Sequence, residues 1–393
     1  MINKSGKNQL SIQELLPILF FAGRILLFLA LIPDDLHGFG DFPIYFDIAA
    51  LPGLPFFNYW VEYPPIYAWT IELISFLSAG NQFIFDFILY LLLTIAGSVS
   101  IWLVGKILEF LDLENQELLN RLILFFGILS FTSYTWWYFD LIPVAMVLGS
   151  IYFFLKGKDT TTGLWVGIGI LTKWFPILLL PAFFKYRKTR SFFKIALIAI
   201  GISALVWGIF WILSPDMTIA SLVSQPSRTS WETIWALIDG NMTTGAYIPL
   251  EWRTLPENAD YSSGNPARIP PLLSLLFLGG LGLTIILKQK DKTNKSLLRL
   301  IAITFLLFFI WSPGWSPQWI LFLLPLLIFV FPLKKSLLFS LIILLLSFIE
   351  WPTMLGHYIF AGLWIIVPLR TILFIGILLQ CIKINNDSGT ESN

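Results

Sequence analysis

Charged side chains are scarce in this sequence. Only 12% of its 393 residues are Asp, Glu, Lys or Arg, whereas a soluble globular domain carries roughly 25%. This shortage excludes a cytosolic enzyme and a disordered chain, and a net charge of +1 gives no general attraction to nucleic acid. The single cysteine excludes a disulfide framework and a cysteine-ligated metal centre. Two histidines are too few for a histidine-rich one.

Apolar residues are correspondingly abundant. They account for 57% of the chain, and the mean hydropathy is +0.79. A bilayer core about 30 Å thick is crossed by about 20 apolar residues in a helix, so the sequence predicts an all-α polytopic membrane protein with about twelve transmembrane helices. Residues 163–172 and 175–184 could also form one broken helix. The expected spans are 15–33, 83–105, 122–139, 141–155, 163–172, 175–184, 195–213, 271–287, 300–311, 320–331, 337–349 and 360–382.

Positive charge gathers in alternate breaks between these spans. Because cytoplasmic loops carry an excess of Lys and Arg, both termini are expected to be cytoplasmic, with 66–80 lying in the interface and no cleaved signal peptide. Acids gather on the opposite side, in two long outer loops at 34–65 and 214–270. The lysine- and arginine-bearing breaks are 156–158, 185–194, 288–299 and 334–335.

The first outer loop combines acids with a rigid proline segment. Its aspartates are Asp34, Asp35, Asp41 and Asp47, and it ends in Glu62-Tyr63-Pro64-Pro65. The two prolines fix backbone dihedrals, and an acid on such a rigid lip beside a lipid headgroup can act as a general base. The alternative is that these acids simply solvate the loop.

Lys173 stands between two apolar stretches, in the segment 171–176. A cation there is costly unless it meets an anion or water. Pro176 interrupts the helix, so backbone N–H groups freed nearby could help to hold an anion such as a phosphate headgroup. The alternatives are a lysine that snorkels to the interface or one that pairs with a neighbouring acid.

Asp140 follows the aromatic run 136–139 at the expected outer end of a span. The aromatic residues are typical of an interfacial belt. The acid is either a site residue or the N-cap of the next helix, a position that aspartate favours.

Two arginines, Arg24 and Arg370, fall within apolar spans. Arginine inside a membrane is normally functional or paired with an acid. Asp86 and Glu350 are the candidate partners, and the sequence alone does not pair them.

The second outer loop is rich in tryptophan. Trp231, Trp235 and Ile238 recur at helical spacing, which predicts an amphipathic helix on the outer leaflet. Tryptophan faces beside arginine and acid also suit the binding of sugar or lipid phosphate. The charged side chains of interest here are Arg228, Glu232 and Arg253.

A turn rich in proline and tryptophan follows at 311–319. Its prolines and glycine explain the change of chain direction. The amide of Gln318 could form a hydrogen bond in a cavity beside this turn.

Taken in order, these segments resemble a GT-C type integral-membrane glycosyltransferase, and most closely the polyprenol-phosphate-dependent enzymes of glycosyltransferase family 87, which include bacterial mannosyltransferases. The resemblance covers the first seven spans well and the remainder loosely. The matching segments are Asp41-x-x-x-Tyr45, Glu62-Tyr63-Pro64-Pro65, Phe139-Asp140, Gly163-x-x-x-Gly167 leading to Leu171-Thr172-Lys173-Trp174-Phe175-Pro176, and Ser316-Pro317-Gln318-Trp319.

The resemblance implies a division of the chain and a location. Residues 1–213 would form a conserved seven-span module, 214–270 the second outer loop, 271–384 variable spans and 385–393 a polar tail. The active site would face outward from a bacterial cytoplasmic membrane. The donor would be a lipid-phosphate-linked monosaccharide, and the acceptor a glycolipid or cell-envelope glycan.

The resemblance also implies roles for single residues. Asp41 would be the catalytic base, with Asp47 or Asp35 as alternatives, and Lys173 would contact the donor phosphate together with Arg228 and Arg253. The residues expected to bind substrate are Tyr45, Glu62, Tyr63, Asp140, Trp231, Glu232 and Gln318.

The chemistry of such a reaction suits these residue types. One base would deprotonate the acceptor hydroxyl and one cation would stabilise the departing phosphate, so that a single displacement inverts the anomeric centre. No cofactor is expected; a divalent metal held by Asp41 and Asp140 is less favoured than a metal-free mechanism. The rival functions are a secondary transporter, for which we find no matching halves, and a lipid-binding assembly protein without catalysis.

Overall fold

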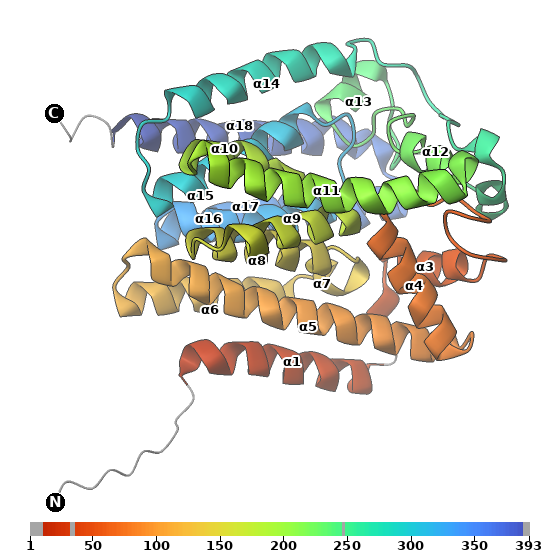
Figure 1. Cartoon of the computed structure of the whole chain (residues 1–393), viewed down its shortest axis with the longest axis horizontal. Coiled ribbons are helices and arrows are strands. Elements are labelled where there is room, and N and C mark those ends of the chain that lie inside the picture. The colour runs from red at the N-terminus through yellow and green to blue at the C-terminus, as the bar shows by residue number, and fades with distance from the viewer. Residues whose placement is uncertain (1–10, 32–35, 246–247, 388–393) are drawn as a thin grey trace, which may run out of the picture.

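The computed structural model describes residues 11–31, 36–245 and 248–387. It is an all-α protein, 77% helical, and no strand occurs in these ranges. Most helices run roughly parallel or antiparallel along one direction of the molecule (Figure 1). The α-helices are α1 Ile12–Ala30, α3 Phe42–Ala49, α4 Pro65–Ser78, α5 Gln82–Leu108, α6 Asn115–Phe131, α7 Tyr134–Trp137, α8 Leu141–Leu155, α9 Asp159–Thr172, α10 Leu180–Tyr186, α11 Thr189–Leu213, α12 Pro215–Val223, α13 Ile234–Asp239, α14 Pro271–Lys288, α15 Asn294–Trp311, α16 Ile320–Val330, α17 Leu333–Phe348 and α18 Leu363–Asp387.

The helices confirm an all-α polytopic membrane protein. Within the described ranges, seven helical stretches are long and apolar enough to cross a bilayer. Shorter apolar helices accompany them at Leu141–Leu155, Phe175–Tyr186 and Pro317–Val330. Every span expected from the sequence corresponds to one or more helices of the fold. The expected spans at 122–139 and 163–172 are not among the apolar stretches just named.

The helical structure is interrupted in two of the apolar stretches of the sequence. The span at 122–139 divides where Thr132 takes an extended conformation between α6 and α7. The stretch from 163 to 184 is broken at Lys173, which has φ −159° and ψ 145°. A 3₁₀ turn, Phe175–Leu179, then leads into α10. Pro176 cannot donate a backbone hydrogen bond to continue α9.

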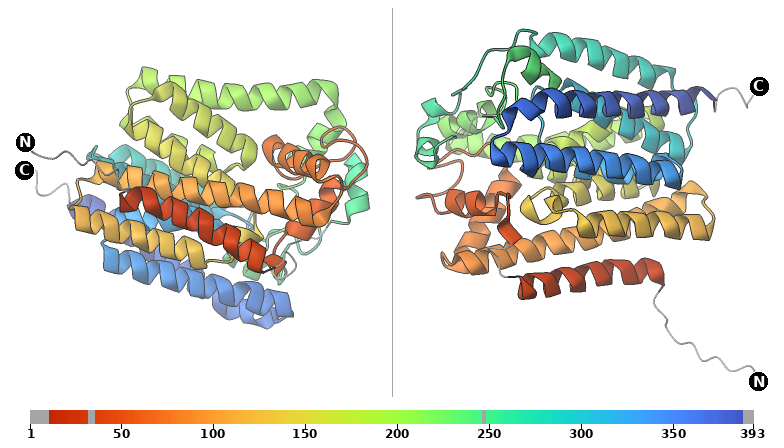
Figure 2. Two further views of the ribbon diagram at one scale, coloured as in Figure 1. Left: turned by 90° about the horizontal axis from the view of Figure 1, so that it is seen from below. Right: turned by 180° about the vertical axis from the view of Figure 1, so that it is seen from behind.

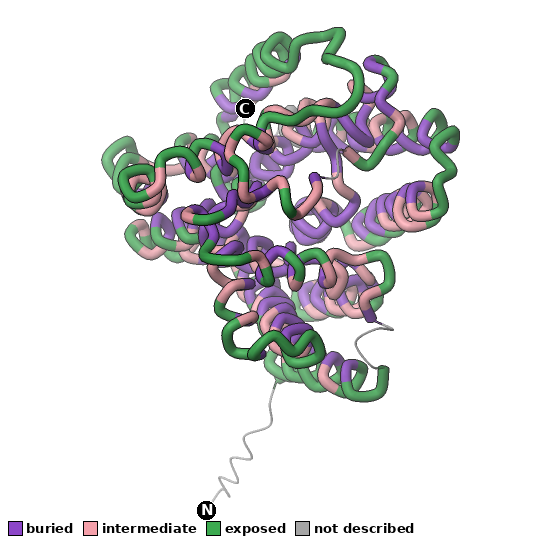
Figure 3. The backbone as a smooth tube through the Cα atoms, turned by 90° about the vertical axis from the view of Figure 1, so that its right-hand side faces the viewer, coloured by how far each residue is buried: buried purple, intermediate pink, exposed green. Residues whose placement is uncertain are grey.

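The centre of the bundle is filled by α16, all of whose residues are buried. It packs against α15, α17, α6 and α8. The outermost helices are very different, because α1, α11 and α14 bury only about a fifth of their apolar windows. Seen from the end where α3 and α4 lie, buried backbone concentrates towards the middle (Figure 3). An exposed apolar surface of this kind suits contact with lipid.

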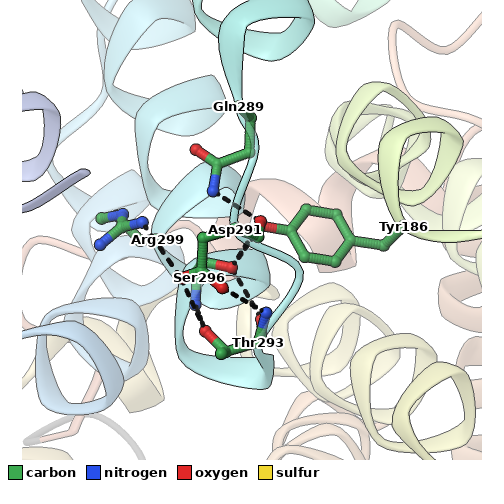
Figure 4. Close-up of polar contacts among 6 residues, drawn as sticks. All are labelled: Tyr186, Gln289, Asp291, Thr293, Ser296 and Arg299. Carbon is green, nitrogen blue, oxygen red and sulfur yellow. Dashed lines mark hydrogen bonds and ion pairs between the residues drawn. The ribbon is translucent and has the colours of Figure 1, made fainter. Parts of the chain in front are cut away.

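The two ends of the bundle differ in character. The connections after α8, α10 and α14 and the end of α18 lie at one end, whereas α3, α4 and α12 lie at the other (Figures 1 and 2). Polar contacts tie the first of these ends together: the Tyr186 hydroxyl lies 2.6 Å from Ser296 Oγ and donates to the Asp291 carbonyl at 3.1 Å (Figure 4). Lysine-rich breaks therefore gather at the end opposite the first outer loop.

The arginines within the apolar spans have protein partners. Arg370 on α18 forms a buried ion pair with Glu350, one of the two acids considered for it. Arg24 on α1 donates instead to the side chain and carbonyl of Thr135, at 2.7 and 3.0 Å. Asp86 lies 2.8 Å from His37. These contacts hold α1, α5, α7 and α18 in place.

Candidate active site

The first outer loop delivers Asp41 directly before α3. Its N–H donates to the Trp137 carbonyl at 2.9 Å, which fastens the loop to α7. A Cβ on Gly40 would lie only 2.6 Å from that carbonyl oxygen, so the close approach requires glycine. One helical turn later, the Tyr45 hydroxyl lies 3.3 Å from Asp41 Oδ2. The carboxyl is thereby fixed at a defined place in the loop.

The protonation equilibrium of Asp41 is shifted towards neutral pH. Burial and, second, the negative charge of Asp140 raise the pKa of Asp41 to about 7, although Lys173 and the Tyr45 hydroxyl oppose the change. Burial acts in this direction because it penalises the charged carboxylate. A carboxyl with a pKa near the working pH is suited to accept a proton during a reaction.

Lys173 forms an ion pair with Asp140. Its Nζ lies 2.6 Å from Asp140 Oδ1, and the two side chains are only 12% and 3% exposed. Asp140 directly precedes α8, but its side chain makes no cap hydrogen bond. The carboxylate therefore pairs with Lys173 and does not cap the helix. The break between α9 and the 3₁₀ turn at Phe175–Leu179 turns Lys173 towards this acid.

Glu62 brings two arginines of the second outer loop to the first. Arg253 donates to both carboxylate oxygens, and Arg228 Nη2 lies 3.3 Å from Oε1. Burial alone would raise the pKa of Glu62, but the charge of Arg253 and its hydrogen bonds, with a further contribution from Arg228, lower it to about 2. Glu62 is therefore ionised at neutral pH, and two guanidinium groups share one carboxylate.

Backbone contacts fix the two outer loops against each other. The Trp60 N–H donates to the Arg253 carbonyl at 2.9 Å, and the Val61 N–H donates to Ser221 Oγ at 3.1 Å. Trp60 is fully buried and packs in a small cluster with Ala220 on α12. The loops consequently act as one ordered layer at this end of the bundle.

Trp231 differs from the sequence-based expectation. It lies outside the short helix α13, in an extended bridge where its N–H donates to the Pro313 carbonyl at 3.1 Å and its carbonyl accepts from Trp315 at 3.2 Å. The indole packs on Gly314, where a Cβ would come within 2.1 Å of the ring. The residues Trp231, Trp235 and Ile238 therefore do not form one amphipathic helix. The pattern of spacing could not reveal a pairing with a turn some eighty residues away.

Two adjoining cavities open among these elements. The first, of about 390 Å³, is lined by Asp41, Tyr45, Tyr138, Glu232 and Arg253, among others; we call it the polar cavity. The second, of about 420 Å³, is lined by Lys173 and by apolar residues such as Phe175, Leu178, Phe308 and Trp311; we call it the apolar cavity. Both volumes fall within the range of ligand sites, roughly 300–1,000 Å³.

The two cavities share one wall, to which both outer loops and the turn before α16 contribute. Arg228 and Trp231 from the second loop stand there, with the Arg228 guanidinium 6.0 Å from the indole centroid. Polar groups on either side can thus act on one ligand that extends through both cavities. The shared residues are Glu62, Tyr63, Arg228, Trp231, Ser316 and Gln318.

Almost all of the residues expected to form the site come together here. The exception is Asp140, which lines neither cavity and contacts the site through Lys173. Of the alternative bases, Asp47 also lines neither cavity, and Asp35, like Asp34, lies outside the described residues. The expected residues that line one or both cavities are Asp41, Tyr45, Glu62, Tyr63, Lys173, Arg228, Trp231, Glu232, Arg253 and Gln318.

Some lining residues were not expected from the sequence. Tyr138 lines the polar cavity, although its aromatic run is typical of an interfacial belt. Tyr67 on α4, four residues after Tyr63, and Trp351, which follows α17, line the same cavity. The spacing of Tyr63 and Tyr67 was the signal that could have identified one of the three.

Across the described ranges, no group of three or more His, Cys, Asp and Glu side chains is arranged to hold a metal ion. Of the two acids considered as metal ligands from the sequence, Asp140 accepts a hydrogen bond from Lys173.

Comparison with known proteins supports the assignment suggested by these residues. A search of curated protein sequences found no significant match. The sequence model of glycosyltransferase family 87 matches residues 60–313, which is most of the chain and includes Glu62, Asp140, Lys173 and the whole second outer loop. The chain therefore belongs to glycosyltransferase family 87 and is a membrane-embedded glycosyltransferase.

Proposed function

We propose that the protein transfers a monosaccharide from a polyprenyl-phosphate carrier to an acceptor hydroxyl of a glycolipid or cell-envelope glycan, with inversion at the anomeric carbon. The observation that carries this proposal is the adjoining pair of cavities. Asp41 lines the polar cavity, Lys173 lines the apolar cavity, and polar residues form the wall between them. An acceptor on one side and a lipid phosphate on the other would meet at this wall.

The surroundings of the apolar cavity suit a prenyl chain. It shares Leu178, Phe308 and Trp311 with a second apolar groove of about 440 Å³ beside α14 and α15. That groove in turn shares Pro181 and Ile286 with a third, of about 380 Å³, which reaches α10 and α11. The second and third grooves are both lined by residues of the poorly buried helix α14. Such a series can hold an extended hydrocarbon chain, which would enter from the bilayer.

Charge is placed where the carrier phosphate would lie. Lys173 supplies an ammonium group in the apolar cavity. Arg228 lines both cavities and shares Glu62 with Arg253, so one positive charge of this trio is not balanced by the carboxylate. We assign Lys173 and Arg228 to the donor phosphate directly. We propose that Arg253 acts on the donor phosphate indirectly, through its ion pair with Glu62.

The proposed reaction is a single displacement. Asp41 accepts the proton of the acceptor hydroxyl as that oxygen forms a bond to the anomeric carbon. The bond from the anomeric carbon to the phosphate oxygen breaks, and its electron pair leaves with the polyprenyl phosphate. Lys173 and Arg228 stabilise the charge that develops on the leaving group. Tyr45 and Tyr63 would bind substrate beside Asp41, and Gln318 and Trp231 would do so at the shared wall.

We assign this reaction to the extracytoplasmic face of a bacterial cytoplasmic membrane. The lysine-rich connections gather at the end of the bundle opposite α3 and α4 (Figure 1), and both of these helices line the polar cavity. Because such residues favour the cytoplasmic side, the cavities would face outward. A carrier in the outer leaflet would then reach Lys173 without leaving the bilayer.

A metal-free mechanism is part of the proposal. Lys173 occupies one oxygen of Asp140, which leaves this acid poorly suited to join Asp41 as a metal ligand. The cationic groups already present can perform the electrostatic role at the phosphate. The competing hypothesis is a divalent ion bound by the two aspartates.

The proposal is tested with purified protein in nanodiscs and a panel of polyprenyl phosphates that carry mannose, glucose or arabinose. Mass spectrometry follows release of polyprenyl phosphate, with and without EDTA, and nucleotide sugars serve as control donors. We expect release from at least one lipid donor, unchanged by EDTA. Turnover of a nucleotide sugar but of no lipid donor would contradict the donor assignment, and loss of turnover in EDTA would contradict the metal-free mechanism.

A further inference from the structure

Glu232 is a buried acid whose side chain the fold leaves available to a ligand. It is 5% exposed, and its Oε2 atom has no hydrogen-bond partner in the described part of the chain. The residue lines the polar cavity together with Asp41. A buried polar atom without a partner is costly, so the position calls for a group that completes its hydrogen bonding.

The backbone at Glu232 is held in a conformation that residues with a Cβ rarely adopt. Its φ is 54°, in the left-handed region. Three contacts enforce this: Arg370 donates to the Glu232 carbonyl, while the Trp231 N–H and the Thr233 hydroxyl both donate to Pro313, at 3.1 and 2.9 Å. Backbone strain maintained in this way clusters at ligand sites. The strain and the unpartnered oxygen occur in the same residue.

The chemistry of the cavity indicates what this acid would bind. Burial raises the pKa of the Glu232 carboxyl, although the charge of Arg370 opposes the change, and a protonated carboxyl can both donate and accept a hydrogen bond. Tyr45, Tyr63 and Tyr138 add hydroxyl groups and aromatic faces to the same cavity. Such a lining suits a compact molecule that carries several hydroxyls.

We propose that Glu232 binds a second hydroxyl of the glycolipid or glycan acceptor, next to the hydroxyl that Asp41 deprotonates. This inference rests on the proposed function. Glu232 is placed on the acceptor because it lines the cavity that contains Asp41 and not the cavity that contains Lys173. Glu232 acts by positioning the acceptor, and no proton transfer in the reaction depends on it.

Two substitutions separate this role from a purely structural one. Glu232→Asn shortens the side chain so that it no longer reaches the second hydroxyl, and asparagine tolerates the left-handed conformation better than glutamate does. Glu232→Gln keeps the length and both hydrogen-bonding functions. The matched control is Glu251→Asn in the same loop, where the side chain is exposed and lines neither cavity.

The probes are methyl hexopyranosides, their monodeoxy derivatives, myo-inositol and 1-propanol. For the best acceptor, Glu232→Asn is expected to raise KM about tenfold or more, with kcat at saturating acceptor and donor affinity little changed. Glu232→Gln should recover most of this loss. One monodeoxy acceptor should react equally poorly with wild type and Glu232→Asn, because its missing hydroxyl is the one that Glu232 binds.

A binding measurement makes the test independent of turnover. Calorimetric titration of the best methyl glycoside into Asp41→Asn protein should show binding, and Asp41→Asn/Glu232→Asn should show about tenfold weaker binding. Equal KM values and equal affinities with and without Glu232 would overturn the inference. So would transfer to 1-propanol as efficient as transfer to a glycoside. If instead the donor proves to be a nucleotide sugar, the proposed function fails, while the glycoside titration still decides the role of Glu232.

Discussion

Lys173 Nζ lies 2.6 Å from Asp140 Oδ1, although the two residues are 33 positions apart, Asp140 directly before α8 and Lys173 directly after α9. Lys173 lines the apolar cavity, and Asp140 does not. A phosphate that binds at Lys173 would share its ammonium group with Asp140. The pair therefore prepares the lysine for an anion while keeping both buried charges compensated.

Asp41→Asn is expected to abolish sugar transfer, with kcat lower by about 10²–10⁴-fold, which is the usual contribution of a general base. Binding of the lipid donor should be retained, because Asp41 does not line the apolar cavity. Turnover is measured with the lipid-phosphate sugar that wild type uses. The control is Asp47→Asn, which lies on α3 two residues after Tyr45 and lines neither cavity. A loss of turnover in that variant alone would move the base to Asp47.

The pH dependence of kcat/KM should have an ascending limb near pH 7. The base must be ionised to accept a proton, and the pKa of Asp41 is raised to about 7, so activity should fall as the pH drops below this value. The rate is measured from pH 5 to pH 9 at low donor concentration, where the profile reports the free enzyme. A limb near the ordinary aspartate pKa of about 4 would mean that Asp41 is not the group that titrates.

Lys173→Ala is expected to weaken binding of the polyprenyl-phosphate sugar by about tenfold or more, as loss of a buried charge contact does. It should also lower thermal stability, because Asp140 keeps a buried carboxylate without its cation. The variant Lys173→Ala/Asp140→Asn should recover stability without recovering donor affinity. Donor affinity equal to wild type in a folded single variant would refute the phosphate role.

Arg253→Met should destabilise the protein by about 3–5 kcal/mol, since it breaks a buried ion pair and leaves Glu62 with Arg228 alone. The pKa of Glu62 is lowered to about 2 by Arg253, so the stabilisation from this pair is present above the ordinary glutamate pKa and is lost only as the pH falls towards 2. Thermal unfolding is compared at pH 7. The variant Arg253→Met/Glu62→Leu should have a stability closer to that of wild type. If both variants lose the same stability, the unpaired charge of Glu62 is not the cause of the destabilisation.

Cysteine labelling tests the orientation in the membrane. The natural Cys381 is buried and should give little background. In intact cells an impermeant maleimide should label Ser262→Cys in the second outer loop but not Lys188→Cys, in the break between α10 and α11; both positions are exposed. Labelling of the second position alone would place the cavities on the cytoplasmic side.

The sequence by itself determined the helices, because a helix that crosses a bilayer satisfies its own backbone groups and needs only a sufficient run of apolar side chains. The break at Lys173 could also be predicted from the local sequence, because Pro176 has no N–H group with which to continue the hydrogen bonding of α9. Asp41, Glu62 and Lys173 stood out as charged residues with specific neighbours in a chain that is only 12% charged.

Only the tertiary structure decided which of these groups meet. The pairing of Glu62 with Arg253, the bridge from Trp231 to the turn before α16, and the choice of Asp41 over Asp47 as a cavity residue all depend on segments far apart in the chain. Loop sequences have no periodic pattern from which such contacts could be predicted. Their positions follow from the packing of side chains and from the need to pair buried polar groups, and both are properties of the assembled fold.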